Sequence, residues 1–407
     1  MILKMKNIGR FYKESVIEIN GITILGGANG TGKSTIGKVL YCVFAGLYDC
    51  DNKVLDERIN SIRRTLNFSS FSNRIFANRG VSLRKRIKEL IYEGDANLLH
   101  SIAEIVGVAD EEIPEDVLNR VKDIISASND DVVGMILRRY LAEEFYSQVG
   151  HVNYPNEESL VELKIKDKTV SVKIGNNVSV DSDIQILKDL VYVDDPYVID
   201  ELSLGIGPYY HTHRTDLAQK LRNRYLDQVS AVDDVIMDSK LESIYEKLES
   251  VCGGSVKEKN DEYFYTDKNL KSGILVQNLS TGIKCFVILK TLLQKGYLEE
   301  NGIVVLDEPE AHLHPEWMLT YAEIIALLQK ELGINFVIST HSSEFLSYLE
   351  LFTKKYELKD KCKYYYLEED REDSSFTDIQ DCTDDIAKMY EALTRPYIWA
   401  SKELDSE

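Results

Sequence analysis

Ten consecutive residues, LDEPEAHLHP at 306–315, place three carboxylates and two histidines within reach of one another. One possibility is a transition-metal site built from these side chains. The other is one wall of a nucleotide site, where carboxylates hold a hard cation and orient water. The five candidate side chains are Asp307, Glu308, Glu310, His312 and His314. Motifs elsewhere in the chain must decide between the two.

A glycine-rich segment near the start, GGANGTGKST at 26–35, contains the pattern G-x-x-x-x-G-K-[ST]. It follows the strand-like ITIL and precedes the helix-like IGKVLYCVFAGLY. In this context glycines let backbone N–H groups and a helix N-terminus surround phosphates. Lys33 would reach the β and γ phosphates of ATP, and Ser34 would ligate Mg²⁺. The residues predicted to bind the nucleotide here are Gly27, Asn29, Gly30, Thr31, Gly32, Lys33, Ser34 and Thr35.

A phosphate-binding loop needs a carboxylate at the end of a neighbouring parallel strand. The segment IVVLDEP at 303–309 supplies one, because four apolar residues precede Asp307. We predict that Asp307 holds Mg²⁺ and that Glu308 is the general base for the attacking water. The two histidines stand two residues apart, without a cysteine partner or helical spacing, which disfavours the transition-metal alternative. ATP and Mg²⁺ are the predicted cofactors, and ATP hydrolysis is the predicted reaction.

The elements around these motifs predict an α/β fold. Short strands are expected in residues 1–25 and at 190–195, a hairpin or meander at 160–180, and mostly helices over 53–150. From residue 280 onward helix and strand alternate, which predicts a parallel sheet covered by helices. The expected elements are helix 282–296, strand 303–306, helix 315–332 and strand 334–340.

Composition indicates a globular protein of the cytoplasm. The 407 residues are 44% hydrophobic with a formal net charge of -20, which argues against a surface that coats nucleic acid. No leader and no apolar run long enough for a membrane span is expected. The six cysteines lack C-x-x-C spacing, so we interpret them as reduced thiols.

The order of motifs resembles that of ABC-type ATPases: a P-loop, NLSTGIK at 278–284, LDEP, and STHSSEFL at 339–346. LDEPEAHLHPEW together with ISTHSSEFL is similar to the RecF/OLD-like branch. KNIGRFYKESVIEINGITILGGANGTGKST is similar to the opening of SMC, RecF and OLD heads. The resemblance implies an ABC-type P-loop NTPase head with a mixed sheet, a β-subdomain and a helical insertion.

The resemblance also implies roles for residues outside the P-loop. Ser280 and Gly282 would start a helix that donates to the γ-phosphate of ATP held by a second subunit, so a homodimer or higher oligomer through the heads is implied. EAHLHP resembles the loop that lines this interface, and His341 resembles the switch histidine that senses the γ-phosphate. Arg10, and Asn7 beside it, match positions near the nucleotide. The glutamine that couples the lid in such heads cannot be placed from the sequence.

The biological role follows from resemblance alone. The region between the motif blocks lacks the long coiled coil of SMC proteins, and 66 residues follow His341, too few for the nuclease domain of OLD proteins. We therefore expect a separate effector protein, a nuclease or a toxin, and a role as the ATPase of a bacterial anti-phage defence system. The alternatives are a RecF-like DNA-repair ATPase and a slowly hydrolysing, ATP-dependent scaffold that sequesters an effector.

The predicted organisation has five parts along the chain. They are an N-terminal part of the head with the P-loop (1–50), a helical insertion (51–150), a β-rich part of the head (151–200), a helical lid or insertion (201–255), and a C-terminal part of the head with the remaining motifs (256–407).

Two further features leave alternatives open. Residues 53–88 contain ten Lys or Arg and two acids. They could contact nucleic acid, bind an acidic protein, or form amphipathic helices whose arginines are solvated or paired. His211 and His213 could belong to a metal-dependent hydrolytic centre, although a structural role in the lid or at a subunit contact is favoured.

Overall fold

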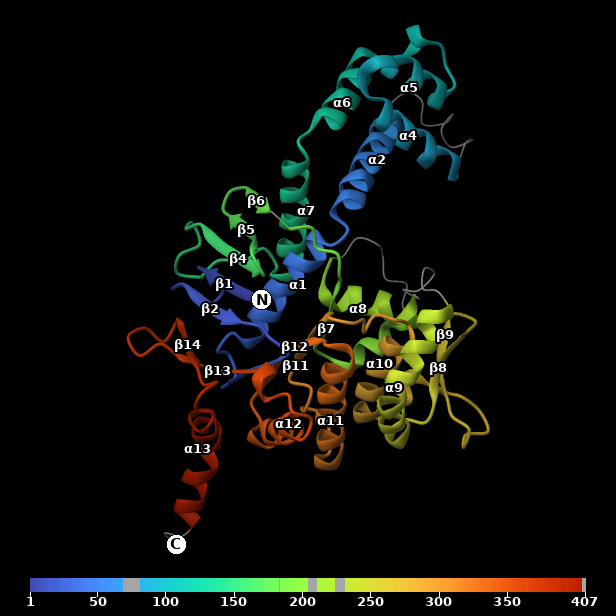
Figure 1. The fold of residues 1–407 in the computed structure, drawn as a ribbon. Coiled ribbons are helices and arrows are strands. Elements are labelled where there is room, and N and C mark those ends of the chain that lie inside the picture. Colours follow the sequence, from blue (N-terminus) through green and yellow to red (C-terminus); the bar gives the residue numbers. More distant parts are fainter. Residues whose placement is uncertain (69–80, 183, 204–210, 224–230, 405–407) are drawn as a thin grey trace.

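A six-stranded mixed sheet forms the centre of the protein (Figure 1). The computed structural model describes residues 1–68, 81–182, 184–203, 211–223 and 231–404. All neighbouring strands of this sheet pair in parallel except β13 and β14, which pair antiparallel at one edge. In spatial order the strands are β14 (Thr377–Asp381), β13 (Cys362–Glu369), β3 (Ile22–Gly27), β12 (Asn335–Thr340), β11 (Ile303–Asp307) and β7 (Leu190–Val193). The predicted α/β class and mixed sheet are confirmed.

The register of the parallel strands brings the predicted motifs to one edge of this sheet. Gly26 lies opposite Thr340, and Ser339 lies opposite Asp307. The P-loop, the acidic end of β11 and the segment after β12 therefore leave the sheet side by side.

Each face of the sheet contributes to a different core, because alternate side chains of a strand point to opposite faces. Ile24, Leu306 and Ile338 pack against one set of helices. Leu25 and Val305 pack on the other side, against the P-loop helix and a second sheet. The helices of the first set are α8 (His213–Arg222), α9 (Ala231–Val251), α10 (Thr281–Gln294), α11 (Pro315–Leu332) and α12 (Ser343–Lys355), and the P-loop helix is α1 (Lys33–Leu47).

The second sheet is the antiparallel β-subdomain. Its order is β2 (Ser15–Glu18), β1 (Ile2–Lys6), β4 (Ser159–Ile165), β5 (Lys168–Ile174) and β6 (Val178–Ser182). The last three strands form the expected meander.

A third sheet was not predicted. It consists of β10 (Ile274–Leu275), β9 (Glu262–Thr266) and β8 (Ser255–Lys259). Asn260 and Asp261 connect β8 to β9 with φ values of 54° and 61°. Two adjacent left-handed residues are typical of a tight hairpin turn. This Asn-Asp pair between two alternating segments was the signal that the sequence interpretation overlooked.

The helical insertion forms an arm that projects from the body of the protein (Figure 1). It has a core of its own, which includes Ile62, Ile87, Ile102 and Val121. The arm helices are α2 (Cys50–Phe68), α4 (Val81–Glu93), α5 (Leu98–Val106), α6 (Glu115–Ser126) and α7 (Asn129–Glu144), with short 3-10 turns at Gly94–Asn97 and Asp110–Glu112.

Two glycines let α7, the last helix of the arm, pack closely against the head. A Cβ on Gly46 of α1 would lie 2.4 Å from Cδ2 of Leu137, and a Cβ on Gly134 would lie 2.3 Å from the carbonyl oxygen of Val178. At Gly134 the neighbouring atom belongs to the backbone, so a larger residue would force α7 away from β6, whereas at Gly46 the Leu137 side chain would have to move.

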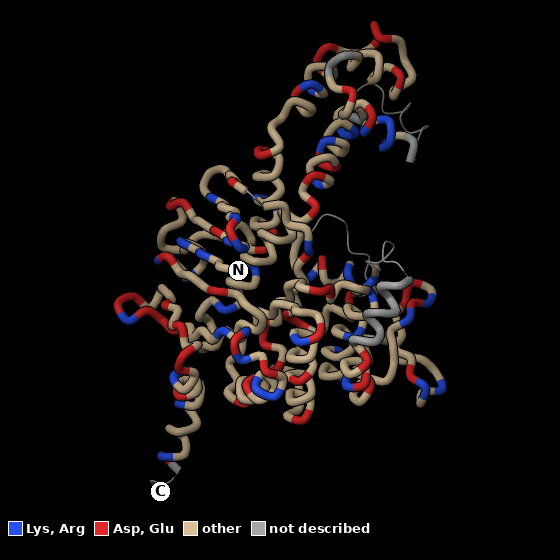
Figure 2. The backbone as a smooth tube through the Cα atoms, in the orientation of Figure 1, with Lys and Arg blue, Asp and Glu red and all other residues tan. Residues whose placement is uncertain are grey.

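Basic and acidic positions both occur along the arm helices (Figure 2), and several of the basic side chains of residues 53–88 have partners within the arm. Arg58 donates to the carbonyl oxygen of Ala127 at 2.7 Å and to Asn129 at 2.8 Å, and Arg84 pairs with Asp56. These contacts agree with the amphipathic-helix interpretation for the residues concerned. Residues 69–80 lie outside the described part, so contact with nucleic acid stays a prediction.

The C-terminal segment adds β13, β14 and α13 (Ala387–Leu404). α13 has 18 residues, and Figure 1 shows it extending away from the head. Its buried Met389 packs beside Gly26, where a Cβ would lie 2.2 Å from the methionine methyl. In the described ranges, every helix is too short or too polar to cross a membrane.

His213 joins the arm to the head through two ion pairs. Its Nδ1 lies 2.7 Å from Glu144 at the end of α7, and its Nε2 lies 2.8 Å from Asp194 after β7. Burial would lower the pKa of His213, but the two carboxylates outweigh burial and raise the pKa to about 9. The alternative of a metal centre gains no support, since no group of three metal ligands occurs among the described residues. His213 has a structural role here.

We expect this His213 contact to make stability depend on pH. The pKa rises from 6.5 to about 9 on folding, so the contribution is complete below about pH 6.5 and is lost as pH rises to about 9. Wild type should be more stable than His213→Gln at the low end of this range. The difference between their free energies of unfolding should then shrink by about 3 kcal/mol at most as the pH rises to about 9. Urea unfolding at several pH values measures it, and a pH-independent difference would contradict it.

Candidate functional site

The loop after β3 has the conformation of a phosphate-binding loop. Gly30 and Gly32 adopt left-handed φ values of 80° and 89°, and α1 begins at Lys33. No side chain caps the N-terminus of α1. The N–H groups at its N-terminus and the helix dipole therefore form a site for an anion.

The ammonium group of Lys33 lies across this loop. It is buried and donates to the carbonyl oxygens of Gly27 at 2.9 Å and Ala28 at 3.0 Å. The hydroxyl of Thr31 also donates to the carbonyl oxygen of Ala28, at 2.9 Å. The loop carbonyls thus have internal donors, and Lys33 adds positive charge beside the helix N-terminus.

Asp307 is held at the tip of β11 by two hydroxyl groups. Ser339 donates to its Oδ1, and Tyr192 donates to its Oδ2 at 3.2 Å. The Tyr192 hydroxyl also lies 3.4 Å from the carbonyl oxygen of Ser34. Burial, and then the charge of Asp307, raise the pKa of Tyr192 well above its usual value, so the hydroxyl remains a donor. The two predicted Mg²⁺ ligands, Ser34 and Asp307, are therefore next to the same hydroxyl.

Glu308 faces the P-loop from a strained backbone position. Its φ is 48°, and its N–H donates to both the carbonyl and the hydroxyl oxygen of Ser339, each at 3.1 Å. Its carboxylate is 34% exposed, 3.6 Å from Nζ of Lys33 and 3.3 Å from Nδ1 of His341. Left-handed non-glycine residues occur where function or packing requires them.

Glu310 and His314, two other polar residues of LDEPEAHLHP, make contacts of their own away from the site formed by Asp307 and Glu308. Glu310 is buried and accepts from the Thr340 hydroxyl and, at 3.3 Å, from the N–H of His341, and burial raises its pKa. His314 caps the N-terminus of α11. The structure thus argues against the five-ligand metal site: the described residues contain no cluster of three ligands.

A cavity of about 520 Å³ lies against the P-loop, which is a usual size for a ligand pocket. Eight of the predicted residues line it: Arg10, Asn29, Gly30, Gly32, Lys33, Ser34, Thr35 and Glu308. Gly27, Thr31, Asp307 and His341 are not among the residues that line the cavity. Asp307 and Ser34 both lie near the Tyr192 hydroxyl, and His341 lies 3.3 Å from Glu308.

The sequence interpretation missed several residues of this cavity, among them Gln148, Gly150, His151 and Ser375. Gln148 follows the end of α7, where the chain returns from the arm to the head. The sequence has no other glutamine between Ser34 and the strands at 160–180, so Gln148 is the candidate for the lid-coupling role, which stays a prediction. Recognising that the helix ends at Glu144 would have identified Gln148 as the first glutamine after the insertion.

Arg10 and Asn7 have different roles. Arg10 lines the cavity, while its guanidinium contacts Glu369 at 3.2 Å and the carbonyl oxygen of Ser374. Asn7 is buried and holds the segment around His151, whose N–H it accepts at 3.2 Å. Asn7 therefore supports the cavity wall.

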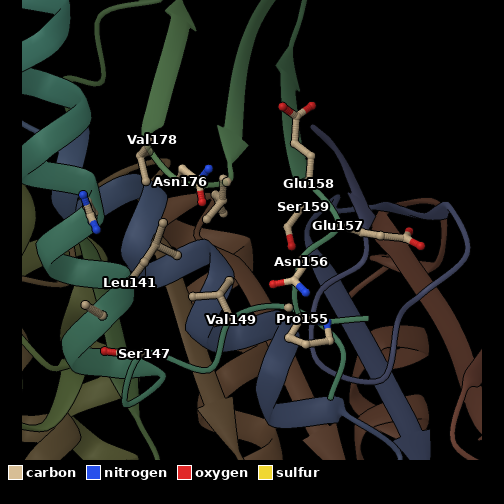
Figure 3. Close-up of a pocket in the computed structure, with 15 residues that line it drawn as sticks. Leu141, Ser147, Val149, Pro155, Asn156, Glu157, Glu158, Ser159, Asn176 and Val178 are labelled. Carbon is tan, nitrogen blue, oxygen red and sulfur yellow. The ribbon is translucent and has the colours of Figure 1, made fainter. Parts of the chain in front are cut away.

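A second cavity, of about 490 Å³, lies between the end of α7 and the turn from β5 to β6 (Figure 3). It shares Gly150 with the first cavity. In Figure 3 the carboxylates of Glu157 and Glu158 point away from Leu141 and Val149. The charged groups of this wall do not converge, so the nucleotide is expected in the P-loop cavity.

Ser280 and Gly282 lie at the N-terminus of α10. Ser280 is exposed and occupies the cap position, although its side chain accepts no capping hydrogen bond. Gly282 is buried, and a Cβ there would lie 2.7 Å from the ring of Trp317. Thr281 contacts the Tyr197 hydroxyl at 3.0 Å. Among the residues that the structure describes, the P-loop cavity is lined by neither Ser280 nor Gly282.

Comparison with known proteins finds a matching family model and several similar solved structures. A model of the family described as "AAA ATPase domain" matches residues 1–346. Among solved structures, the SMC head domain from Thermotoga maritima is similar at 12% identity with a TM-score of 0.41, covering 93% of this chain and 97% of that chain.

Two further solved structures are similar over most of their lengths. The Smc head domain from Pyrococcus furiosus, bound to the C-terminal domain of ScpA, is 13% identical with a TM-score of 0.42, covering 93% of this chain and 95% of that chain. An ATP-binding cassette of an ABC transporter in its ADP conformation is 12% identical with a TM-score of 0.36, covering 98% and 97%.

Two glycine substitutions should separate backbone strain from steric clash in the P-loop. A Cβ at Gly32 would lie 3.0 Å from the ring of Phe11, whereas a Cβ at Gly30 would meet nothing within 4 Å. Gly30→Ala should cost about 1–2 kcal/mol for its left-handed backbone, and Gly32→Ala should cost more. Urea unfolding measures both values. Equal losses of stability in the two variants would show that the Phe11 ring moves aside without a cost in free energy.

Proposed function

This chain belongs to the AAA ATPase domain family, and we propose that it binds ATP with Mg²⁺ in the P-loop cavity and hydrolyses it to ADP and phosphate. The observation that carries the proposal is the convergence of Lys33, Ser34, Asp307 and Glu308 at one edge of the sheet. These four side chains supply a phosphate-binding cation, two oxygen ligands and a base.

The P-loop would bind the phosphates through its N–H groups and Lys33. Ser34 and Asp307 offer a hydroxyl and a carboxylate, which are the hard oxygen ligands that Mg²⁺ prefers, so the residues fit this ion. Bound there, Mg²⁺ would neutralise charge on the transferred phosphoryl group. Tyr192 and Ser339 keep the Asp307 carboxylate in place through their hydroxyls.

Glu308 would orient and deprotonate the attacking water. Its carboxylate is partly exposed and faces Lys33, so water can reach it beside the phosphates. The strained backbone and the bonds to Ser339 fix its direction. His341, 3.3 Å from the same carboxylate, would sense the γ-phosphate from the end of β12.

A second subunit would complete the site. The N-terminus of α10 carries the exposed Ser280 and has no side-chain cap, which suits it to bind the γ-phosphate of a partner's ATP. Lys284 fixes this helix by pairing with Asp200 at 2.7 Å. We therefore favour a homodimer or higher oligomer formed through the heads. Gln148 would couple the nucleotide to the arm, because it lines the cavity directly after α7.

The arm would then pass the nucleotide state to a partner. The role that we favour is the ATPase of an anti-phage defence system in the cytoplasm, acting on a separate nuclease or toxin. The support for this role is the resemblance of the motifs to RecF/OLD-like ATPases. A RecF-like DNA-repair ATPase or a slowly hydrolysing scaffold for an effector remain the alternatives, and turnover with and without DNA separates them.

Glu308→Gln should reduce steady-state ATP hydrolysis by about 10²–10⁴-fold while ATP still binds, because it removes the base alone. Lys33→Ala should lose ATP binding. Glu316→Gln is the matched control, since Glu316 is an exposed carboxylate of the first turn of α11. The assays are phosphate release and equilibrium ATP binding, each with and without double-stranded DNA.

Hydrolysis by Glu308→Gln at the wild-type rate would refute the assignment of the base. Stimulation of wild type by DNA would support a nucleic-acid surface at 53–88. Very slow turnover under every condition, with intact ATP binding, would favour the scaffold.

Ser280→Arg should prevent ATP-dependent dimerisation without changing ATP binding, because the larger cation obstructs the N-terminus of α10. Sedimentation velocity of Glu308→Gln with Mg-ATP, with and without Ser280→Arg, measures this. Ser347→Arg is the control, an exposed serine on α12. A dimer that persists in Ser280→Arg would place the interface elsewhere.

A further inference from the structure

The Tyr192 hydroxyl connects the two residues that we propose as magnesium ligands. Tyr192 lies on β7, opposite Val305 of β11. Its hydroxyl is 3.2 Å from Oδ2 of Asp307 and 3.4 Å from the carbonyl oxygen of Ser34. A Cβ on Gly37 of α1 would lie 3.0 Å from this hydroxyl, so glycine makes room for it. The hydroxyl therefore lies between the first turn of α1 and the tip of β11, within hydrogen-bond distance of both.

The ring of Tyr192 carries this contact further from the nucleotide. It stacks on the imidazole of His213, with ring centroids 4.2 Å apart and planes inclined by 24°. Both rings are buried. The His213 imidazole lies between two carboxylates: its Nδ1 is 2.7 Å from Glu144 and its Nε2 is 2.8 Å from Asp194. The backbone N–H of His213 donates to the second carboxylate oxygen of Glu144 at 2.9 Å.

Glu144 is the last residue of α7, so this series of contacts ends at the base of the arm. Its carboxylate also lies 3.7 Å from Lys38 of α1. A few residues later the chain reaches Gln148 and Gly150, which line the P-loop cavity. Asp307, Tyr192, His213 and Glu144 thus form one continuous set of contacts from the proposed magnesium site to α7.

We propose that Tyr192 is a positioning residue for the magnesium ligands and that His213 and Glu144 couple its position to the base of the arm. The inference rests on the proposed function, because it takes Ser34 and Asp307 as ligands. Packed interiors transmit displacements, so Glu144 cannot move without moving His213 or breaking its ion pair. By linkage, magnesium binding and the position of α7 then affect each other equally.

The test is the magnesium dependence of ATP hydrolysis at saturating ATP. Tyr192→Phe keeps the stacked ring and removes the hydroxyl, so the Mg²⁺ concentration for half-maximal rate should rise about tenfold or more. Glu144→Gln keeps the shape of a side chain that does not touch the ligands, and it should raise the same concentration by a smaller factor. The double variant should show less than the product of the two factors, because both changes interrupt one set of contacts.

Two matched variants control for loss of stability. Tyr265→Phe removes a buried hydroxyl that accepts from the N–H of Gly254 at 2.8 Å in the third sheet. Glu323→Gln removes a buried carboxylate charge that pairs with Lys247 and Lys355, each at 2.8 Å. Both should lower the melting temperature and keep the magnesium dependence of wild type. All four single variants should bind ATP normally in the presence of EDTA.

Wild-type magnesium dependence in Tyr192→Phe would overturn the positioning role. Wild-type dependence in Glu144→Gln, or an equal shift in Glu323→Gln, would overturn the coupling. Different results would overturn the proposed function itself. These are a wild-type protein that neither binds nor hydrolyses ATP, or a Lys33→Ala variant that binds ATP as well as wild type does. If wild type binds ATP without turnover, magnesium-dependent tightening of ATP binding replaces the rate as the readout.

Discussion

The parallel register of β3, β12 and β11 is the constraint on which the site depends. With Gly26 opposite Thr340 and Ser339 opposite Asp307, the three strands end together. Ser339 can then donate to Asp307 and accept from the N–H of Glu308. A shift of one residue would exchange the two faces of a strand and move Asp307 away from these donors. The chemistry of the P-loop cavity is thus fixed by hydrogen bonds in the middle of the sheet.

Most of this arrangement could be predicted from local patterns. The apolar run before Asp307 and the glycines around Lys33 have strong sequence signals, since each motif needs a definite backbone at a definite strand end. The fold class, the meander and α11 were predicted from the periodicity of apolar residues and from the alternation of helix and strand along the chain. The N-terminus of α10 was anticipated through its serine and glycine.

The residues that sequence reasoning missed are defined by contacts between distant segments. Tyr192 is a common strand residue until β7 pairs with β11, and only then does its hydroxyl meet Asp307. Ser375 reaches the cavity from a connection between β13 and β14 that has no local motif. His213 was noticed, but its partners Glu144 and Asp194 come from two other elements. Pairing across elements, unlike periodicity along one, leaves little trace in a single sequence.

The length of the arm gives the close packing of α7 a mechanical consequence. Its neighbour α2 has 19 residues, which at 1.5 Å per residue is a rod of about 28 Å. A tilt of about 10° at the base would sweep the far end of such a rod through about 5 Å. A small tilt of the helices near Glu144 would therefore become a displacement of several ångströms at the tip. The arm would act as a lever that pivots beside the P-loop helix.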